Sequence, residues 1–343
     1  MRVFREKVIP VFIPFMGCPH RCVFCNQRKI TGYKGEVDIQ SISSHISQSL
    51  STLPQDVQRV EIAFYGGSFS CLPRVLQERL LAVAHRYVEL RGLWGIRLST
   101  RPDCLSVGEI EFLKNSGVKT VEIGVQSLDD NVLLKSKRGH TAADAVEAAG
   151  RVKSAGLTLG LQIMLGLPGD TGEEFYHTVN LIVSEIKPEF VRIYPCLVVK
   201  DSELADMYLD GRYNPLTLGE AVDLAKYAYK RFREAGIGVV RIGLQDIPTM
   251  RWGIEILSGP YHPAFGELVK SAVFYDELVD RFEGITSGEV SIVVNPRDES
   301  IFRGQHNLNL LKLRDRYPEI KVNIVKSEEV ERGKFIIHYK KVA

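Results

Sequence analysis

Long apolar segments and an excess of charge of one sign are both missing from this sequence. No apolar run approaches the roughly 18 residues that a membrane-spanning helix needs. The first seven residues also lack the apolar core of a signal peptide. Lys and Arg number 44 against 42 Asp and Glu, so the net charge of +2 neither indicates nor excludes a nucleic-acid partner. We therefore expect a soluble, cytoplasmic protein with no membrane partner.

Cysteine is scarce, and half of it is concentrated in one short segment. Of the six cysteines, three lie between residues 18 and 25, and the others are the isolated Cys71, Cys104 and Cys196. This usage fits a reducing compartment better than a secreted, disulfide-bonded scaffold. Structural zinc sites usually take their ligands from two separated pairs of residues. Because the sequence has no second C-x2-C pair, the argument for a structural zinc site is weaker.

The clustered cysteines form the pattern C-x3-C-x2-C, in which Cys18, Cys22 and Cys25 follow the apolar run at residues 8–15. Thiolates are the soft ligands that iron–sulfur clusters require. Three of them on one loop can hold three corners of a 4Fe-4S cluster and leave the fourth iron open to bind and reduce a substrate. The alternatives are a zinc site with His20 as fourth ligand and thiols that bind no metal.

Strand-like and helix-like segments alternate through the first 250 residues. This alternation predicts an α/β fold with right-handed βαβ units, a parallel sheet and a full or partial (β/α) barrel of the TIM type. The expected strands are residues 8–15, 59–65, 95–100, 118–125, 158–165, 190–194 and 238–242. The expected helices are residues 39–53, 73–90, 107–116, 142–155, 172–186 and 218–235.

Polar and glycine-rich motifs follow the ends of these predicted strands. In barrels of this kind, function collects in the loops after the strands. Besides the cysteine segment, the motifs occupy residues 65–68, 99–103, 124–127, 166–169 and 194–196. Their shared position predicts one site at the carboxyl edge of the sheet.

The isolated cysteines also follow predicted strands, so all three can point toward that site. A second cluster, a thiyl intermediate and a covalent acceptor are the functional interpretations of Cys71, Cys104 and Cys196. The alternative is that they are small buried residues without chemistry.

The sequence changes character beyond about residue 284. We expect a barrel domain at residues 1–284 and a small α+β domain at residues 285–343. Its predicted strands are 290–295, 320–325 and 334–338, with helices at 298–302 and from 304 to about 317. Eleven Lys and Arg against eight Asp and Glu give this part a mild positive charge (11 − 8 = +3).

The cysteine segment resembles the signature of the radical S-adenosyl-L-methionine (SAM) superfamily, with Phe24 at the aromatic position before the last cysteine. The resemblance implies that the three cysteines bind a 4Fe-4S cluster and that the backbone at Phe24 contacts the adenine of SAM. Gly66, Gly67 and Ser68 resemble the family's glycine-glycine-acid motif, which receives the SAM amino group. Ser68 replaces the usual Glu, so carbonyl groups or its hydroxyl would have to serve.

Within the superfamily the chain most resembles the radical SAM part of the Elongator catalytic subunit, which modifies wobble uridine in tRNA. Oxygen-independent coproporphyrinogen oxidase is a more distant likeness. The resemblance implies that Gln126 and Arg138 hold the SAM ribose and carboxylate, with Ser99 and Gln162 lining the same pocket. For Gln162 the alternative is a strand residue that merely faces the barrel interior. The matching stretches are STRPD (99–103), GVQS (124–127), KRGHT (137–141), GLP (166–168), RIYP (192–195), GRY (211–213) and LQDIP (244–248).

Three departures limit what these likenesses imply. The Elongator subunit has a longer gap between its first two cysteines, and it carries an acetyltransferase domain for which we expect no room here. A substrate activated through acetyl-CoA is therefore in doubt. Gln27 replaces the extra cysteine of the porphyrin enzyme, which counts against a porphyrin decarboxylase.

A weaker resemblance concerns the C-terminal part. Residues 301–314, followed by the predicted strand at 320–325, resemble a KH module, which clamps nucleic-acid backbone with a GXXG loop between two helices. The loop here reads Gly304-Gln-His-Asn307, and Asn307 can adopt the left-handed conformation of the missing glycine. In this interpretation Arg303 and Lys312 contact RNA. A plain capping domain that closes the barrel is the alternative.

These patterns predict a radical SAM enzyme that cleaves SAM reductively to a 5′-deoxyadenosyl radical and modifies an RNA (tRNA) nucleoside. A low-potential electron donor of the flavodoxin or ferredoxin type is implied. The first alternative is a radical SAM enzyme acting on a tetrapyrrole, lipid or other small metabolite. The second is a non-catalytic, metal-binding RNA-binding protein. No catalytic residue can be named from the sequence.

Overall fold

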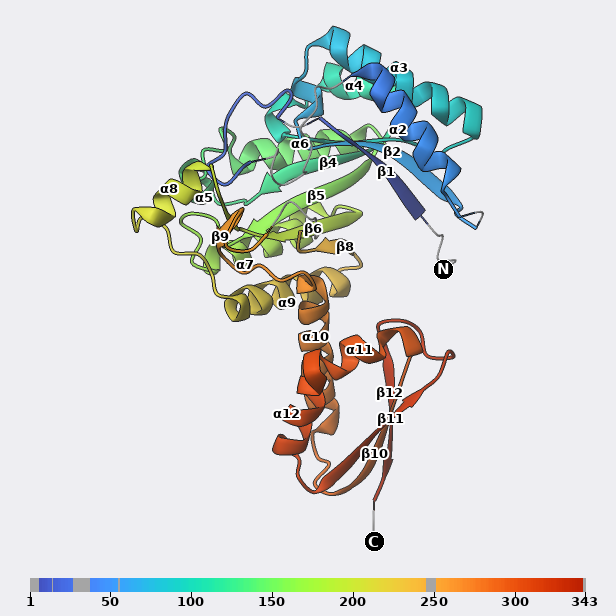
Figure 1. The fold of residues 1–343 in the computed structure, drawn as a ribbon, viewed down its shortest axis with the longest axis vertical. Coiled ribbons are helices and arrows are strands. Elements are labelled where there is room, and N and C mark those ends of the chain that lie inside the picture. The colour runs from blue at the N-terminus through green and yellow to red at the C-terminus, as the bar shows by residue number, and fades with distance from the viewer. Residues whose placement is uncertain (1–5, 14, 27–37, 55, 245–250, 342–343) are drawn as a thin grey trace.

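Seven parallel strands form the main sheet of the protein (Figure 1). The computed structural model describes residues 6–13, 15–26, 38–54, 56–244 and 251–341. Each strand pairs with the next one in the order β1-β2-β3-β4-β5-β6-β8. The strands are β1 (Glu6–Phe12), β2 (Arg59–Tyr65), β3 (Gly95–Thr100), β4 (Val118–Gln126), β5 (Thr158–Leu165), β6 (Phe190–Pro195) and β8 (Gly238–Ile242).

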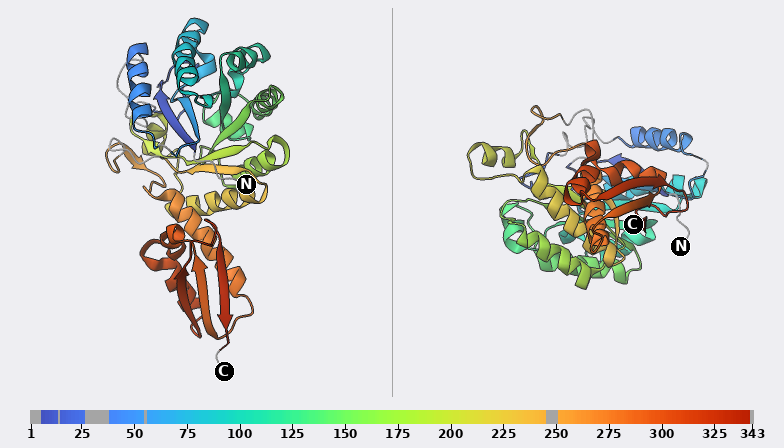
Figure 2. Two further views of the ribbon diagram at one scale, coloured as in Figure 1. Left: turned by 90° about the vertical axis from the view of Figure 1, so that its right-hand side faces the viewer. Right: turned by 90° about the horizontal axis from the view of Figure 1, so that it is seen from below.

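The sheet curls into a half barrel, and the helices cover its outer face (Figure 2). Within the described residues β1 and β8 stand at opposite edges and do not pair, so the predicted barrel is confirmed in its partial form. The helices of this part are α2 (Ile39–Ser51), α3 (Arg74–Arg91), α4 (Val107–Asn115), α5 (Asp130–Lys135), α6 (Ala142–Ser154), α7 (Glu173–Leu181), α8 (Glu203–Leu209) and α9 (Leu218–Glu234).

The two faces of the sheet carry different side chains. Between the sheet and the outer helices lies an apolar core that includes Ile62, Leu98 and Ile163, all fully buried. The inner face carries polar and charged residues such as Glu61, Arg97 and Glu122 on the alternate positions of the same strands. Parallel sheets usually bury both faces in apolar contacts. A polar inner face therefore marks the inside of the half barrel as a place for chemistry or binding.

Most predicted elements match the structure closely. Four predicted strands coincide with β2, β3, β5 and β8, and the six predicted helices agree with the observed ones to within a few residues. The sequence analysis missed the short pair of β7 (Val198–Val199) and β9 (Ile256–Ser258), which lies beside the carboxyl edge. Gln27 and residues 245–248 of the last matching stretch lie outside the described residues.

The C-terminal lobe contains a three-stranded sheet covered by helices (Figure 1). β10 (Gly288–Val294) lies in the middle, parallel to β11 (Ile320–Lys326) and antiparallel to β12 (Phe335–Lys340). The helices α11 (Glu299–Arg303) and α12 (Leu308–Arg316) connect β10 to β11. This β-α-α-β order is the one that the KH resemblance predicts.

One long helix, α10 (Phe265–Phe282), joins the two parts and was not predicted from the sequence. Its first half packs Phe265 and Val269 into the core of the half barrel. Its second half packs Phe274, Leu278 and Phe282 into the separate core of the C-terminal lobe. The two cores therefore share a helix, and the predicted division at residue 284 falls just after it.

The described helices do not meet the requirements of a membrane-spanning segment. None of them combines the length and the apolar character that crossing a bilayer requires.

Candidate active site

The loop after β1, which carries the cysteines, is fastened to the loop after β2. The N–H groups of Ile13 and Phe15 donate to the carbonyls of Tyr65 and Gly66 at 2.8 and 2.9 Å. Gly67 permits this close approach, because a Cβ atom at that position would lie only 2.6 Å from the Ile13 carbonyl oxygen. The predicted glycine pair thus allows the loop after β2 to lie in close contact with the loop after β1.

The second half of the cysteine loop is anchored to two other loops. The Val23 N–H donates to the Ser136 carbonyl at 3.2 Å, and the Val23 carbonyl accepts from the Leu204 N–H at 2.8 Å. The Cys25 N–H closes a turn on the Cys22 carbonyl at 3.0 Å. One side of the loop packs into an apolar cluster; its members include Val23, Phe24, Val132, Leu167, Val198 and Leu204.

Two of the three thiols contact residues that the sequence analysis singled out. The Cys18 sulfur lies 3.5 Å from the Ser68 hydroxyl, and the Arg138 guanidinium donates from Nη1 to the Cys22 sulfur at 3.1 Å. Cys22 is buried, whereas Cys18 and Cys25 are half-buried. A cation therefore lies beside one of the three thiols of the loop.

The thiols are not drawn together into a cage. No group of three or more His, Cys, Asp or Glu side chains within the described residues is placed to hold a metal ion. The fit of a cluster to this loop therefore rests on its donor chemistry: three soft thiols on eight residues, none of them in a disulfide, with a cation beside one of them.

The end of β4 carries a strained, buried glutamine. Gln126 has a φ of +68°, in the left-handed region that side chains other than glycine avoid, and the strand bulges between Gly124 and Gln126. Its side-chain oxygen Oε1 is buried and has no hydrogen-bond partner among the described residues. Strain and an orphaned acceptor at one residue are typical of a binding site.

Arg138 and His140 extend this unsatisfied cluster. Arg138 donates to the Gly124 carbonyl and accepts at its own carbonyl from Arg101, yet its buried Nε has no partner among the described residues. His140 is buried, and neither of its ring nitrogens makes a well-formed hydrogen bond within the part of the chain that the structure describes. Burial, reinforced by Arg138 and Arg101, lowers the pKa of His140 to about 3, so the imidazole stays neutral. His140 escaped the sequence analysis, although it lies inside the matched stretch at residues 137–141.

The inner face of the sheet holds a different kind of cluster, centred on the fully buried Glu122. Its carboxylate accepts from the Tyr65 hydroxyl at 2.7 Å, from Arg192 Nε at 2.6 Å and from Arg97 Nη1 at 3.1 Å. Burial alone would raise the pKa of Glu122, but Arg192 and Arg97 outweigh it and hold the pKa below its ordinary value. Arg97 also pairs with the buried Glu61. These hydrogen bonds and ion pairs cross-link the strands on the inner face of the half barrel.

Ser99 and Gln162 lie together at the margin of this network. Gln162 Nε2 donates to the Ser99 hydroxyl at 3.1 Å, and it lies 3.4 Å from the Glu122 carboxylate. The structure therefore brings the two predicted lining residues into contact on the inner face. Their role toward SAM stays a prediction.

Neither interpretation of the isolated cysteines, as functional thiols or as small buried residues without chemistry, describes Cys71 and Cys104. Cys71 and Cys104 form a disulfide with a Cα–Cα distance of 5.4 Å, which ties the loop after β2 to the loop after β3. They therefore offer no free thiol to a second cluster, and the reducing compartment inferred from cysteine usage does not account for them. Cys196 is buried, and burial raises the pKa of its thiol to about 12. An inert buried residue is the interpretation that fits Cys196.

His20, the suggested fourth zinc ligand, lies against a backbone turn. A Cβ atom on Gly139 would lie 2.5 Å from its imidazole ring. The ring thus packs over the turn that presents Arg138, and this contact accounts for its position without a metal.

Comparisons with known proteins agree with this architecture. Residues 12–182 match the family model of the Radical SAM superfamily, and residues 188–274 match the Radical_SAM C-terminal domain. Uncharacterized protein MJ0486 of Methanocaldococcus jannaschii is 29% identical over 233 residues, 64% of this chain and 71% of that protein. The fold resembles the solved structure of Methanocaldococcus infernus Elp3 with residues 1–46 deleted, at a TM-score of 0.62 and 24% identity over 81% of this chain and 64% of that one.

Two relatives carry functional names. The tRNA uridine(34) acetyltransferase of M. jannaschii is 34% identical over 50% of this chain and 31% of its own length. Elongator complex protein 3 of Drosophila melanogaster is 28% identical over 63% of this chain and 47% of its own length. The chain thus spans less than half the length of these named relatives. With a half barrel, a cysteine loop at its carboxyl edge and family matches that run from residue 12 to residue 274, this chain belongs to the radical SAM superfamily of enzymes.

Proposed function

We propose that the protein holds a 4Fe-4S cluster on Cys18, Cys22 and Cys25 and binds SAM beside it. One observation carries the proposal: beside the same cysteine loop, buried polar atoms of Gln126, Arg138 and His140 lack well-formed hydrogen bonds to any residue that the structure describes. A buried polar group without a partner costs about 1–3 kcal/mol, so a cluster of them indicates a polar ligand that completes their hydrogen bonds. SAM, with its ribose hydroxyls and carboxylate, has that chemistry.

The chain's own residues divide the work as follows. Arg138 offers donors both to the Cys22 thiolate and to the SAM carboxylate, and Gln126 offers an acceptor to a ribose hydroxyl. The Gly66–Ser68 segment receives the amino group, with the Ser68 hydroxyl in place of the family's acid, and the backbone at Phe24 receives the adenine. Ser99 and Gln162 line the inner wall of the pocket. When bound, the cluster and SAM supply a 5′-deoxyadenosyl radical through one-electron cleavage of a C–S bond.

The proposed substrate is a nucleoside of tRNA. It is supported by the likeness to tRNA uridine(34) acetyltransferases and Elongator proteins and by the β-α-α-β order of the C-terminal lobe. The loop between α11 and α12 is exposed, and Asn307 has a φ of +60°, as the GXXG comparison predicts. Reduction requires a low-potential donor of the flavodoxin or ferredoxin type.

Anaerobic reconstitution with iron and sulfide tests the cofactor. We expect about four irons per chain and release of 5′-deoxyadenosine when SAM and dithionite are added. Cys22→Ala abolishes both, whereas Cys196→Ala, which removes a buried thiol outside the loop, keeps both. A colourless wild-type protein, or a Cys22→Ala variant with unchanged iron, contradicts the proposal. Bound zinc with intact SAM would favour the non-catalytic binding protein.

Binding of tRNA at low salt tests the substrate. Of the two cations expected near the GXXG-like loop, Arg303 is engaged by Glu299 at 2.9 Å, whereas Lys312 is exposed, with its ammonium 5.4 Å from the centre of the Tyr275 ring. Lys312→Ala should therefore weaken binding more than Arg303→Ala. No binding of tRNA at low salt would direct the search to a small-molecule substrate.

A further inference from the structure

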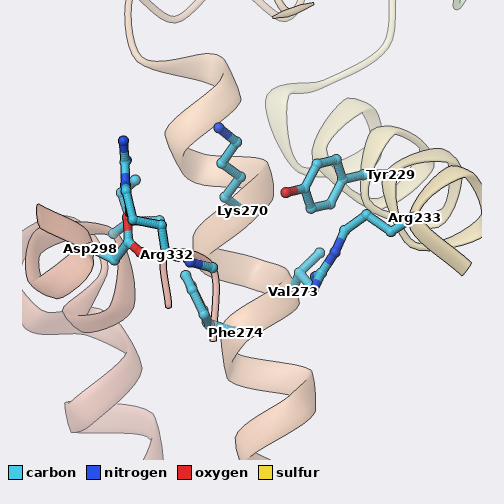
Figure 3. Close-up of a pocket in the computed structure, with 9 residues that line it drawn as sticks. Tyr229, Arg233, Lys270, Val273, Phe274, Asp298 and Arg332 are labelled. Carbon is cyan, nitrogen blue, oxygen red and sulfur yellow. Dashed lines mark hydrogen bonds and ion pairs between the residues drawn. The ribbon is translucent and has the colours of Figure 1, made fainter. Parts of the chain in front are cut away.

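A cleft of about 280 Å³ separates the half barrel from the C-terminal lobe (Figure 3). Tyr229 and Arg233 of α9 form one wall, Lys270 of α10 forms the back, and Asp298 and Arg332 of the lobe form the other wall. In Figure 3 the Lys270 side chain rises between Arg332 on one side and Tyr229 on the other, and the Tyr229 hydroxyl points toward α10. At about 30 Å³ per water, the cleft has room for a hydrated anion.

The cleft lies away from the cysteine loop. Tyr229 and Arg233 occupy the last two turns of α9, which ends at Glu234 and is separated by three residues from the start of β8 at Gly238. In a βαβ unit the end of a helix lies at the amino edge of the parallel sheet. A ligand in this cleft therefore sits at the opposite edge from the proposed cofactor.

Among the described residues, one carboxylate lines the cleft, and its oxygens already accept hydrogen bonds. Asp298 is 4% exposed, and it accepts from Arg332 Nε and Nη2 at 3.2 and 3.1 Å and from the Gly333 N–H at 2.7 Å. These bonds fix the Arg332 guanidinium at the wall and use only two of its three nitrogens. Its remaining nitrogen, Nη1, has no hydrogen-bond partner in the described part of the chain.

The other donors of the cleft differ in their pairing. Arg233 forms an ion pair with Glu277 at 3.2 Å. Lys270 is half-buried and makes no hydrogen bond or ion pair with any described residue. Burial, helped by Glu277 and opposed by Arg233, raises the pKa of Tyr229, so its hydroxyl remains a proton donor. The cleft thus presents an ammonium unpaired within the described residues, a guanidinium edge and a hydroxyl, while its carboxylate Asp298 is already engaged.

We propose that this junction cleft, formed by Tyr229, Arg233, Lys270, Asp298 and Arg332, binds a phosphate group. Resting on the proposed function, the inference assigns that phosphate to the backbone of the RNA substrate, which would then touch both lobes at once. Lys270 supplies the charge, Arg332 supplies a planar donor held in place by Asp298, and Tyr229 supplies a neutral donor. A free phosphate compound offers the same chemistry, and the experiment separates the two sources.

The salt dependence of tRNA binding tests the proposal on the full-length, reconstituted protein. Each phosphate contact contributes about 0.7–0.9 to the slope of log K against log salt. Lys270→Ala should reduce that slope by this amount between 50 and 200 mM KCl. Lys321→Ala is the matched control, because Lys321 is an exposed lysine of the same lobe that pairs with Glu289 at 2.9 Å outside the cleft; its slope should equal that of the wild type.

Titration with inorganic diphosphate distinguishes the sources. Diphosphate binding that Lys270→Ala abolishes, with no change in the tRNA slope, assigns the cleft to a free phosphate compound. An unchanged tRNA slope together with no loss of diphosphate binding overturns the proposal. Iron content and 5′-deoxyadenosine release without RNA are measured on the same samples and should be equal in all variants. Their absence from the wild type would defeat the proposed function without deciding the phosphate site.

Discussion

Two groups of buried polar side chains on the same sheet are built in opposite ways. On the inner face, Glu122 is surrounded by donors: Tyr65, Arg97 and Arg192 hydrogen-bond to its carboxylate at 2.6 to 3.1 Å. At the carboxyl edge, Gln126, Arg138 and His140 are also buried, but some of their polar atoms have no partner within the described ranges of the chain. The first group completes itself within the chain. The second group is incomplete, which is the state expected of residues whose partner is a ligand.

Removal of the Glu122 carboxylate tests the complete group and has the largest expected effect. Glu122→Ala leaves Arg97 and Arg192 buried without their counter-charge, and breaking such a pair costs about 3–5 kcal/mol. Urea unfolding should show that loss. Glu111→Ala, at an exposed position of α4, should change the free energy of unfolding by no more than about 0.5 kcal/mol. Equal stability of the two variants would show that the network does not hold the half barrel together.

Replacement of Arg138 tests the incomplete group through its ligand. Arg138→Met should weaken SAM binding to the reconstituted protein by about 10- to 100-fold, because hydrogen bonds to charged groups contribute about 1.5–3 kcal/mol. Calorimetric titration measures the effect. Arg151→Met, which removes an arginine paired with Glu147 on the surface of α6, should leave SAM affinity unchanged. Unaltered affinity in Arg138→Met would remove this residue from the site.

The pH dependence of stability gives a third test, centred on His140. Its folded pKa of about 3 lies below the ordinary value of 6.5, so between these values the unfolded chain binds a proton that the folded chain does not. The free energy of unfolding therefore falls as the pH drops, by about 1 kcal/mol between pH 7.5 and 5.5. His140→Leu should lose this share of the dependence. If urea unfolding gives the same change in the free energy of unfolding between pH 7.5 and 5.5 for the wild type and for His140→Leu, His140 is not buried as a neutral imidazole.

The smallest effect on stability is expected for Gln126→Gly. Glycine relieves the positive φ, which costs other residues about 1–2 kcal/mol, but it loses about 0.5–1 kcal/mol through its greater freedom in the unfolded chain. The free energy of unfolding should therefore stay within about 1 kcal/mol of the wild type, while SAM affinity falls about tenfold through loss of one hydrogen bond. A strongly destabilised variant would mean that Gln126 serves the fold and not the ligand.

The sequence predicted the edge of the sheet better than its inner face. Strand bounds and the loops that follow them were visible because apolar runs and glycine-rich turns are local signals. The family resemblance implied that Gln162 and Ser99 line one pocket, but it did not predict the hydrogen bond between them. Glu122, Arg97 and Arg192 were missed, because their partners come from strands 25 to 70 residues apart and no local pattern records such pairing.

Two other omissions have different causes. Helix α10 did have a signal, since Phe265, Val269, Phe274, Leu278 and Phe282 recur every four or five residues along it. The Cys71–Cys104 disulfide had none, because a separation of 33 residues does not reveal which cysteines meet.

The disulfide has a practical consequence for work on the cofactor. It links the loop that contains Ser68 to the loop that contains Arg101. Arg101 in turn donates a hydrogen bond to the Arg138 carbonyl. Thiol reductants that protect iron during reconstitution also attack accessible disulfides. Samples prepared with and without such reductants should therefore be compared before SAM affinities are assigned to single residues.

Helix α10 decides how the molecule can be divided. A fragment that ends at residue 284 would expose Phe274, Leu278 and Phe282 to water. A fragment that begins there would lose these three side chains from the core of the C-terminal lobe. No boundary between the half barrel and the C-terminal lobe leaves both cores intact, because α10 contributes side chains to each of them. A displacement of either end of α10 is therefore transmitted to the other lobe.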